Sequence, residues 1–146
     1  MSTGLITTEP IDYLVVGHVP QDITPTGLMM GGTVTYAALT AQALGYKVGI
    51  VTSARDDLDL NPLNGIPVHL IPAEYSTTFK NQPTPFGRQQ YLYHTAKTLA
   101  AGDIPVAWQT APIIHAHLGH IADIVRQARA VRQAREVREL DATATT

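Results

Sequence analysis

The glycine pair Gly31-Gly32 and the short segment after it have the composition of a ligand-binding turn. Glycines accept backbone conformations that other residues avoid, and they let a ligand come close to the main chain. Small and apolar residues continue to Gly45, which predicts a helix that ends there with a left-handed residue. Thr33 or Thr35 would cap its first turn. The N-terminus of such a helix can hold an anion or a polar ligand, although glycine pairs before helices also occur as ordinary turns.

Three histidines near residue 117 could together ligate a metal. His115 and His117 lie two residues apart in a segment that predicts a strand, so they would share one face, and His120 follows closely. Zinc and nickel accept imidazole ligands. The carboxylates that usually orient such imidazoles are not evident in the sequence nearby. We therefore assign no metal site, and core or surface histidines stay as the alternative.

The composition is that of one globular domain. The chain has 146 residues, of which 45% are hydrophobic and 15% are charged, and its net charge is −2. These values favour a packed core and do not favour nucleic acid or an anionic membrane as a partner. The absence of cysteine excludes disulfides, thiolate catalysis and cysteine-ligated zinc. With no signal-peptide pattern and no long apolar run, a cytoplasmic location is the default expectation.

Apolar runs alternating with a helical pattern predict an α/β domain. The run over 11–17 is almost continuously apolar, as in a strand buried on both faces. Residues 18–30 are expected to form a loop, and 46–52 a second strand after the glycine-led helix. Residues 66–94 are β-branched or aromatic and are broken by proline and glycine, which predicts strands and hairpins. A further strand is predicted within 112–119.

The order of these elements resembles the N-terminal part of the ribokinase-like (PfkB) carbohydrate kinase family. A strand, a loop with Asp22, the Gly-Gly helix, Leu44-Gly45 and a second strand follow one another as in that family, and the similarity covers residues 12–125. It continues through residues 77–81, 87–91 and 112–115. The resemblance implies a Rossmann-like layered sheet with helices on both faces and a small β lid near 66–94. It also implies an ATP-dependent kinase acting on a sugar or nucleoside.

The resemblance further implies which residues hold the substrate. An aspartate at the position of Asp22 binds sugar hydroxyls in the family, and a carboxylate accepts two such hydrogen bonds at once. Tyr36 stands where many relatives have asparagine, so a ring that could stack replaces an amide that would bond hydroxyls. Polar residues of the lid strands could reach the same ligand, or could simply face solvent. The candidate substrate-binding residues are Asp22, Gly31, Gly32, Tyr36, Arg88 and Gln90.

The chain lacks the catalytic half of such a kinase. Ala100-Ala101-Gly102-Asp103 superficially resembles the family's Gly-Ala-Gly-Asp motif, but Pro105 follows where the family has a long helix. We expect Asp103 to cap a short helix that has Pro105 in its first turn. Family members are much longer, and their C-terminal half supplies the nucleotide pocket, the anion hole and the catalytic aspartate. The sequence therefore predicts a truncated ribokinase-like fold without a catalytic residue, in which ATP and Mg²⁺ are implied by resemblance alone and do not bind tightly.

Residues 121–140 predict a terminal helix. Apolar residues recur at spacings of three and four from Ile121 to Val131. Half of the ten Lys and Arg residues lie between Arg126 and Arg138, but a six-residue repeat spreads them around the helix. Acidic residues dilute the positive charge, so nucleic acid is not the expected partner. We expect residues 126–146 to form an Arg-rich, solvated helix with a disordered tail.

Two functions of different classes stay open at this point. The first is the sugar-binding part of a carbohydrate or nucleoside kinase over residues 1–125, inactive alone because phosphoryl transfer needs the donor half. The second is a non-catalytic binding or homo-oligomeric assembly module. An incomplete sheet exposes an apolar edge, and such an edge favours pairing with another chain.

Overall fold

The computed structural model describes residues 9–117. In this range the chain forms eight strands, one α-helix and three short 3-10 helices. The predicted helix over 121–140, the predicted tail and His120 lie outside the described residues. No helix within residues 9–117 is both long and apolar enough to cross a membrane.

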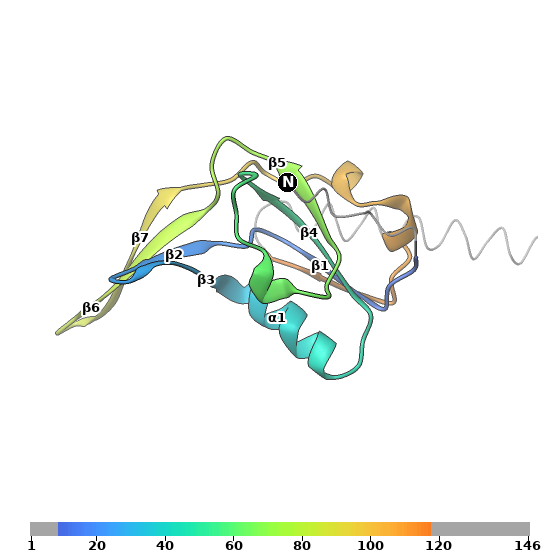
Figure 1. Ribbon diagram of the computed structural model, residues 1–146, viewed down its shortest axis with the longest axis horizontal. Coiled ribbons are helices and arrows are strands. Elements are labelled where there is room, and N and C mark those ends of the chain that lie inside the picture. Colours follow the sequence, from blue (N-terminus) through green and yellow to red (C-terminus); the bar gives the residue numbers. More distant parts are fainter. Residues whose placement is uncertain (1–8, 118–146) are drawn as a thin grey trace, which may run out of the picture.

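Four parallel strands form the main sheet in the order β5-β4-β1-β8 (Figure 1). β1 (Tyr13–Val16) and β4 (Val48–Ala54) lie between β5 (Val68–Pro72) and β8 (Ile113–Ala116). All seven residues of β4 are buried, as expected for a strand that is covered on both faces. The apolar runs of the sequence therefore predicted the two central strands correctly.

Helix α1 (Gly32–Ala43) packs against one face of the main sheet (Figure 1). Its residues Val34, Ala38 and Ala41 are buried in the same core cluster as residues of β1 and β4. Small side chains on this face allow the helix to lie close to the strands. Gly45 has φ +91°, which confirms the predicted left-handed residue after the last turn.

The opposite face is covered by the segment that leads into β8. This segment contains η2 (Ala101–Asp103) and η3 (Val106–Trp108), and Trp108 is completely buried. A Cβ atom on Gly49 would lie 3.2 Å from the Trp108 ring and 2.7 Å from Cδ1 of Ile11. The glycine in β4 therefore makes room for the indole. Short 3-10 turns, rather than a long helix, cover this face in the described part of the chain.

Asp103 does not begin a helix, so the capping prediction is wrong. It is the last residue of η2, and its Oδ2 accepts a hydrogen bond from the backbone N–H of Ala100 at 2.8 Å. Pro105 precedes η3 instead of sharing a first turn with Asp103. A carboxylate three residues into a turn can reach back to the amide at its start, and that local bond prevails here.

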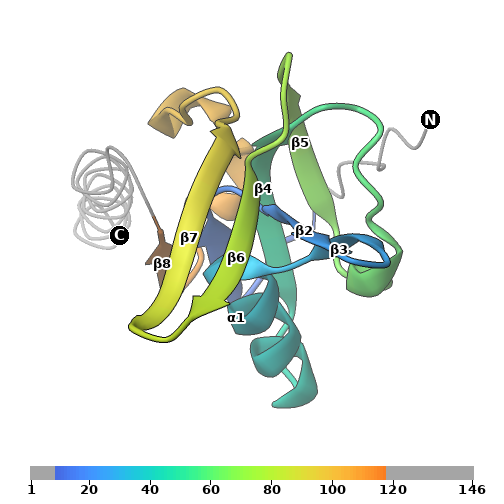
Figure 2. The same cartoon turned by 90° about the vertical axis from the view of Figure 1, so that its left-hand side faces the viewer.

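A second sheet stands beside the main sheet (Figure 2). Two of its strands come from the range 66–94 in which a small β lid was predicted, whereas β5 of that range belongs to the main sheet. The order of this second sheet is β3-β2-β6-β7, and we call it the lid sheet. β2 (Gln21–Thr24) and β3 (Gly27–Met30) form one antiparallel hairpin, and β6 (Thr78–Thr84) and β7 (Gly87–His94) form another. A parallel pairing of β2 with β6 joins the two hairpins.

Residues 18–30 are not the loop that the sequence predicted. They contain the β2–β3 hairpin, whose turn lies at Pro25-Thr26. Asp22 is therefore a strand residue, paired with Met29 on one side and Phe79 on the other. The prediction failed because β2 is short and mostly polar and takes part of its pairing from β6, which is distant in sequence.

A hydrogen-bond network at His18 connects the two sheets. The His18 Nε2 atom lies 2.9 Å from the carbonyl oxygen of Lys97, and its Nδ1 atom lies 2.9 Å from Oγ1 of Thr77. The carbonyl can only accept, so Nε2 carries the proton and Nδ1 accepts from the threonine hydroxyl. The N–H of Ala96 donates to the same threonine oxygen at 3.0 Å. The network thus holds the base of the lid sheet near the end of β1.

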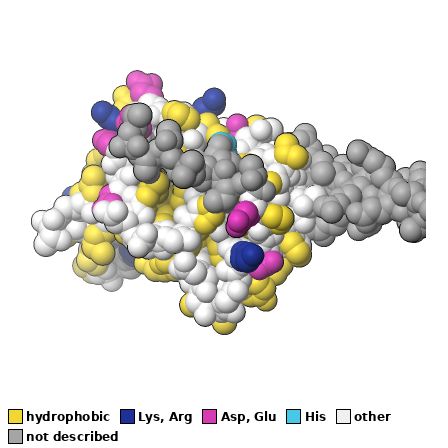
Figure 3. All heavy atoms as spheres, turned by 45° about the vertical axis from the view of Figure 1, so that its right-hand side comes forward, with side chains coloured by type: hydrophobic (Ala, Val, Ile, Leu, Met, Phe, Trp, Pro, Cys, Tyr) yellow, Lys and Arg dark blue, Asp and Glu magenta, His cyan; other side chains and the backbone are white. Residues whose placement is uncertain are grey.

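Charged side chains are sparse on the described surface. On the face shown in Figure 3, the few Lys and Arg side chains are scattered, and some of them lie beside Asp or Glu side chains. Arg55 and Asp57 form an ion pair with an Nε–Oδ2 distance of 3.5 Å, and both side chains are exposed. Exposed pairs of this kind contribute little to stability.

Candidate substrate site between the lid sheet and α1

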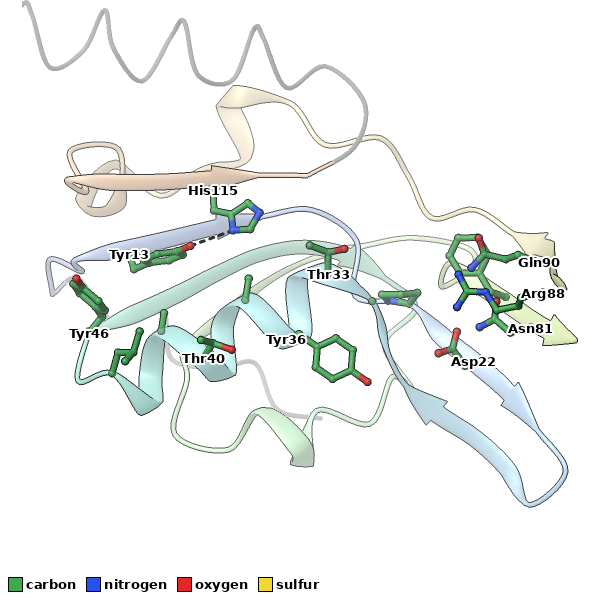
Figure 4. A pocket seen from close by; sticks show the side chains of 16 residues that line it. Tyr13, Asp22, Thr33, Tyr36, Thr40, Tyr46, Asn81, Arg88, Gln90 and His115 are labelled. Carbon is green, nitrogen blue, oxygen red and sulfur yellow. Dashed lines mark hydrogen bonds between the residues drawn. The ribbon is translucent and has the colours of Figure 1, made fainter. Parts of the chain in front are cut away.

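A cavity of about 770 Å³ extends from the lid sheet along α1 to the β1 and β8 strands (Figure 4). Its volume lies within the range of small-molecule sites in proteins. Polar side chains line the end at the lid sheet, and tyrosines line the opposite end. We call these the polar end and the aromatic end of the cavity.

Three strands of the lid sheet supply the polar end. Asp22 comes from β2, Asn81 from β6, and Arg88 and Gln90 from β7, and their side chains lie close together in Figure 4. Asn81 is directly opposite Gln90 in the β6–β7 register. Arg88 and Gln90 share a face because they are two residues apart on one strand. The sheet thus collects four hydrogen-bonding side chains at one place.

Asp22 and Arg88 are the charged side chains among the described residues that line this cavity. Partial burial raises the pKa of the Asp22 carboxyl, and the positive charge of Arg88 opposes part of that rise. The carboxylate is therefore partly removed from water. Hydroxyl groups that donate to it would replace the lost hydration.

The side-chain oxygen of Asn81 is buried and has no hydrogen-bond partner within residues 9–117. A buried acceptor without a partner costs about 1–3 kcal/mol, and a ligand hydroxyl would remove this cost. The sequence analysis did not name this residue. The sequence did contain a signal for Asn81. It lies two residues after Phe79, so both side chains share one strand face, and a β6–β7 hairpin would place it opposite Gln90.

Gly31 and Gly32 at the start of α1 each exclude a side chain, but for different structural reasons. Gly32 has φ +84°, and a Cβ atom there would overlap the ring of Pro20. Gly31 has an extended backbone with φ −141°, but a Cβ atom there would overlap the carboxylate of Asp22. Of the two glycines, Gly32 therefore uses the positive φ that glycine allows, and Gly31 does not. The absence of a side chain at Gly31 leaves space for the carboxylate of Asp22, the residue predicted to bind sugar hydroxyls.

Neither predicted threonine caps α1, which begins without a side-chain cap. Thr35 Oγ1 donates to the carbonyl oxygen of Gly31 at 2.8 Å, a backward bond common for threonine inside helices. Thr33 lines the cavity instead. The first turn of α1 therefore begins beside the cavity with Gly32 in its wall.

Tyr36 lies on α1 between the two ends of the cavity (Figure 4). Its side chain is 66% exposed, so its ring is accessible to a ligand. An exposed aromatic ring beside polar groups suits the apolar face of a sugar or the face of a base. Of the predicted residues, five line the cavity and Gly31 lies behind Asp22; the five are Asp22, Gly32, Tyr36, Arg88 and Gln90.

The aromatic end was missed by the sequence analysis. Tyr13 and Tyr46 have ring centroids 6.0 Å apart, and the Tyr13 hydroxyl lies 3.1 Å from Nδ1 of His115. His115 therefore has a phenol as its partner. His117 lines a different cavity of about 290 Å³, so the two histidines do not converge. Among residues 9–117, no group of three His, Cys, Asp or Glu could hold a metal ion.

Comparison with known proteins gives matches in fold. No protein-family model matches the sequence, and no curated protein matches it. A pyrophosphate-dependent kinase in the ribokinase family, complexed with a pyrophosphate analogue and myo-inositol, superposes with a TM-score of 0.51 at 22% identity, over 62% of this chain and 35% of that chain. An uncharacterized sugar kinase from Pyrococcus horikoshii gives 0.59 at 13% identity, over 71% and 44%. Fructokinase with bound ATP from Xylella fastidiosa gives 0.57 at 14%, over 73% and 42%.

These matches define the class of fold. The chain has a mixed α/β fold with a parallel sheet, and it is the fold of part of a ribokinase-family sugar kinase. The resemblance stated from the sequence is thereby confirmed at the level of the fold. The chain spans less than half of the length of each of these three structures.

Proposed function

We propose that this chain is the substrate-binding part of a ribokinase-like carbohydrate or nucleoside kinase. The observation that carries the proposal is the convergence of Asp22, Arg88 and Gln90 on one cavity beside the Gly32 turn. These residues come from separate parts of the sequence and from two strands of the lid sheet. The fold matches, which are to sugar kinases, support the same function.

The polar end has the chemistry to bind a ligand with several hydroxyl groups. Asp22 accepts two hydroxyl hydrogen bonds, and the buried oxygen of Asn81 accepts another. Arg88 and Gln90 donate to hydroxyl oxygens. Tyr36 packs against the ring of the ligand. A sugar, a cyclic polyol or the ribose of a nucleoside offers donors and acceptors in this arrangement.

This chain alone binds the acceptor and does not transfer a phosphoryl group. Transfer requires positive charge around the moving phosphoryl group. The described lining of the cavity has one guanidinium, Arg88, and the carboxylate of Asp22 offsets its charge. We therefore expect neither Mg²⁺-ATP nor pyrophosphate to bind tightly to this chain, and the activity requires a donor site supplied from elsewhere.

Thermal denaturation with a panel of hexoses, pentoses, myo-inositol and nucleosides tests this proposal. A ligand at 100 times its Kd stabilises the folded state by about 2.7 kcal/mol, which raises Tm by several degrees for a chain of this size. We expect such a shift with at least one polyhydroxylated ligand and no further shift with Mg²⁺-ATP or pyrophosphate. Asp22→Asn should abolish the shift because it removes a charged acceptor.

Two neighbouring glutamines provide a matched control. Gln90 faces the cavity, whereas Gln89 is on the other face of β7 and accepts from the Tyr91 hydroxyl at 2.7 Å. Gln90→Ala should weaken ligand binding about tenfold, corresponding to the loss of one hydrogen bond of roughly 1.4 kcal/mol, and Gln89→Ala should not. Equal effects of the two variants, or a ligand shift that survives Asp22→Asn, would contradict the proposed site.

A binding or homo-oligomeric assembly module is the second candidate function. It is favoured by the lid sheet, in which all eight residues of β7 are exposed and Leu28 and Met29 are more than half exposed. Apolar surface on a sheet favours association. Light scattering that gives the mass of a single chain at high protein concentration would rule out the homo-oligomeric form of this function.

A further inference from the structure

Asn81 occupies a central place among the side chains of the polar end of the cavity. It belongs to β6, an inner strand of the lid sheet that has β2 on one side and β7 on the other. Asn81 is opposite Gln90 of β7. Phe79, two residues before Asn81, is paired with Asp22 of β2. Because residues two apart on a strand share a face, Asn81 is on the same face as Asp22 and Gln90 (Figure 4).

Asn81 differs from its polar neighbours in its access to water. Arg88 and Gln90 belong to β7, in which every residue is exposed, so water can satisfy their side chains. The side-chain oxygen of Asn81 is buried and has no hydrogen-bond partner within residues 9–117, although two donors line the same cavity. Buried polar atoms without a partner are rare in folded proteins. In the wall of a cavity, such an atom is an acceptor left free for a ligand.

We propose, on the basis of the proposed function, that Asn81 determines which polyols the site selects, by requiring a hydroxyl donor at one fixed position of the ligand. The carboxylate of Asp22 accepts from many arrangements of hydroxyl groups and supplies affinity. Asn81 supplies selectivity, because its buried oxygen accepts a hydrogen bond that only a correctly placed hydroxyl can donate. The exposed side chain of Gln90, opposite Asn81, has room to move aside as that hydroxyl enters.

The burial of this oxygen determines the size of the effect. A ligand without the hydroxyl leaves the acceptor unpaired in the complex, where the bound ring keeps water out. Sites built to hydrogen-bond a substrate hydroxyl strongly reject analogues that lack it, for this reason. Loss of the ligand partner of the exposed Gln90 has a smaller effect, because water replaces it. The strongest discrimination therefore belongs to the ligand position that faces Asn81.

Ligand analogues test this selectivity with the unaltered protein. The probes are D-glucose, D-fructose, D-ribose, myo-inositol and adenosine, each with analogues in which one hydroxyl is replaced by hydrogen or by fluorine. A fluorine atom fills the position but cannot donate a hydrogen bond. Isothermal titration calorimetry should show one position at which both replacements raise Kd about 100-fold, because both leave a buried acceptor unpaired.

Asn81→Leu and Gln82→Leu form a matched pair of variants. Both replace an amide by an apolar side chain on β6, but Gln82 is exposed and lies on the other face of the strand. Asn81→Leu should raise Kd for the parent compound about 100-fold and bring parent and deoxy analogue to within about threefold of each other. It should also bind the deoxy analogue more tightly than the unaltered protein does, because two apolar groups then meet. Gln82→Leu should keep the original preference.

The stability of the protein without ligand separates a binding role of Asn81 from a structural one. An acceptor left free for a ligand destabilises the empty site. Asn81→Leu should therefore raise Tm in the absence of ligand, whereas Gln82→Leu should change it little. A lower Tm for Asn81→Leu than for Gln82→Leu would indicate a structural amide and would overturn the inference.

The binding results distinguish a failure of this inference from a failure of the proposed function. Binding that requires Asp22 but has no hydroxyl position dependent on Asn81 would overturn the inference alone. Equal effects of Asn81→Leu and Gln82→Leu would do the same. Unweakened binding of the fluorine analogue at the selected position would also overturn it, since the ligand then accepts a hydrogen bond there. If none of the parent compounds binds, the proposed function and this inference both fail.

Discussion

Asp22 illustrates how the partial burial of a single carboxyl group makes stability depend on pH. Its carboxyl is partly buried beside Arg88, and the burial raises its pKa in the folded state. Gly31 makes this position available, because any larger residue there would overlap the carboxylate. The position thus combines a cost to folding with an acceptor suited to hydroxyl groups, which is a common arrangement in binding sites.

The raised pKa of Asp22 predicts the sign of a stability change. As pH rises from about 4, where an ordinary aspartate titrates, the unfolded chain loses this proton before the folded chain does. The free energy of unfolding therefore falls through the interval between the two pKa values and levels off above the folded pKa. The Asp22→Asn variant has no carboxyl group at this position, so its free energy of unfolding does not fall for this reason. Urea denaturation of both proteins over a pH series should show the variant gaining relative stability as pH rises and then a constant difference, and a difference independent of pH would contradict the assignment.

At the scale of elements, Trp108 is the largest of the buried side chains that cover the second face of the main sheet. Trp108 on η3 is fully buried over Gly49, and each of the two 3-10 helices in this segment is only three residues long. Trp108→Ala should lower the free energy of unfolding by about 3–5 kcal/mol, as for other large-to-small changes in cores. Val106→Ala on the same turn is the control, since Val106 is 81% exposed. Denaturant unfolding of the two variants would show whether η3 is anchored in this way.

The features that could be predicted from the sequence are those determined by residues close together in the chain. The buried run of β4, the left-handed Gly45 and the alternation that places Arg88 and Gln90 on one face all follow from neighbouring residues. Asp22 was placed in a loop because its strand is paired with the distant β6. Likewise, the partnership of Tyr13 and His115 depends on strand pairing between residues far apart in the chain.

At the scale of the whole molecule, residues 9–117 consist of a parallel sheet that supplies the scaffold and a lid sheet that supplies most of the polar side chains lining the cavity. The polar end of the cavity lies on the lid sheet, whereas Gly32 and Tyr36 belong to the helix on the main sheet. A bound polyol would touch both units. Ligand binding should therefore stabilise the whole fold cooperatively, which is why Tm is a suitable measurement for the binding test.

The parallel pairing of β2 with β6 has a consequence for the order of folding. The β6–β7 hairpin closes locally, whereas β3, α1, β4 and β5 separate Gln21 from Thr78 along the sequence. Strand pairings between residues far apart in the sequence form slowly. The chain between them loses conformational entropy when the loop closes, before the new contacts can offset that loss. Pulsed hydrogen exchange during refolding should protect the amides of β4 before that of Gln21, which donates to the carbonyl oxygen of Thr77 at 2.8 Å. The polar end of the cavity would then form after the central strands of the main sheet, so a refolding chain would acquire part of its scaffold before it could recognise a ligand.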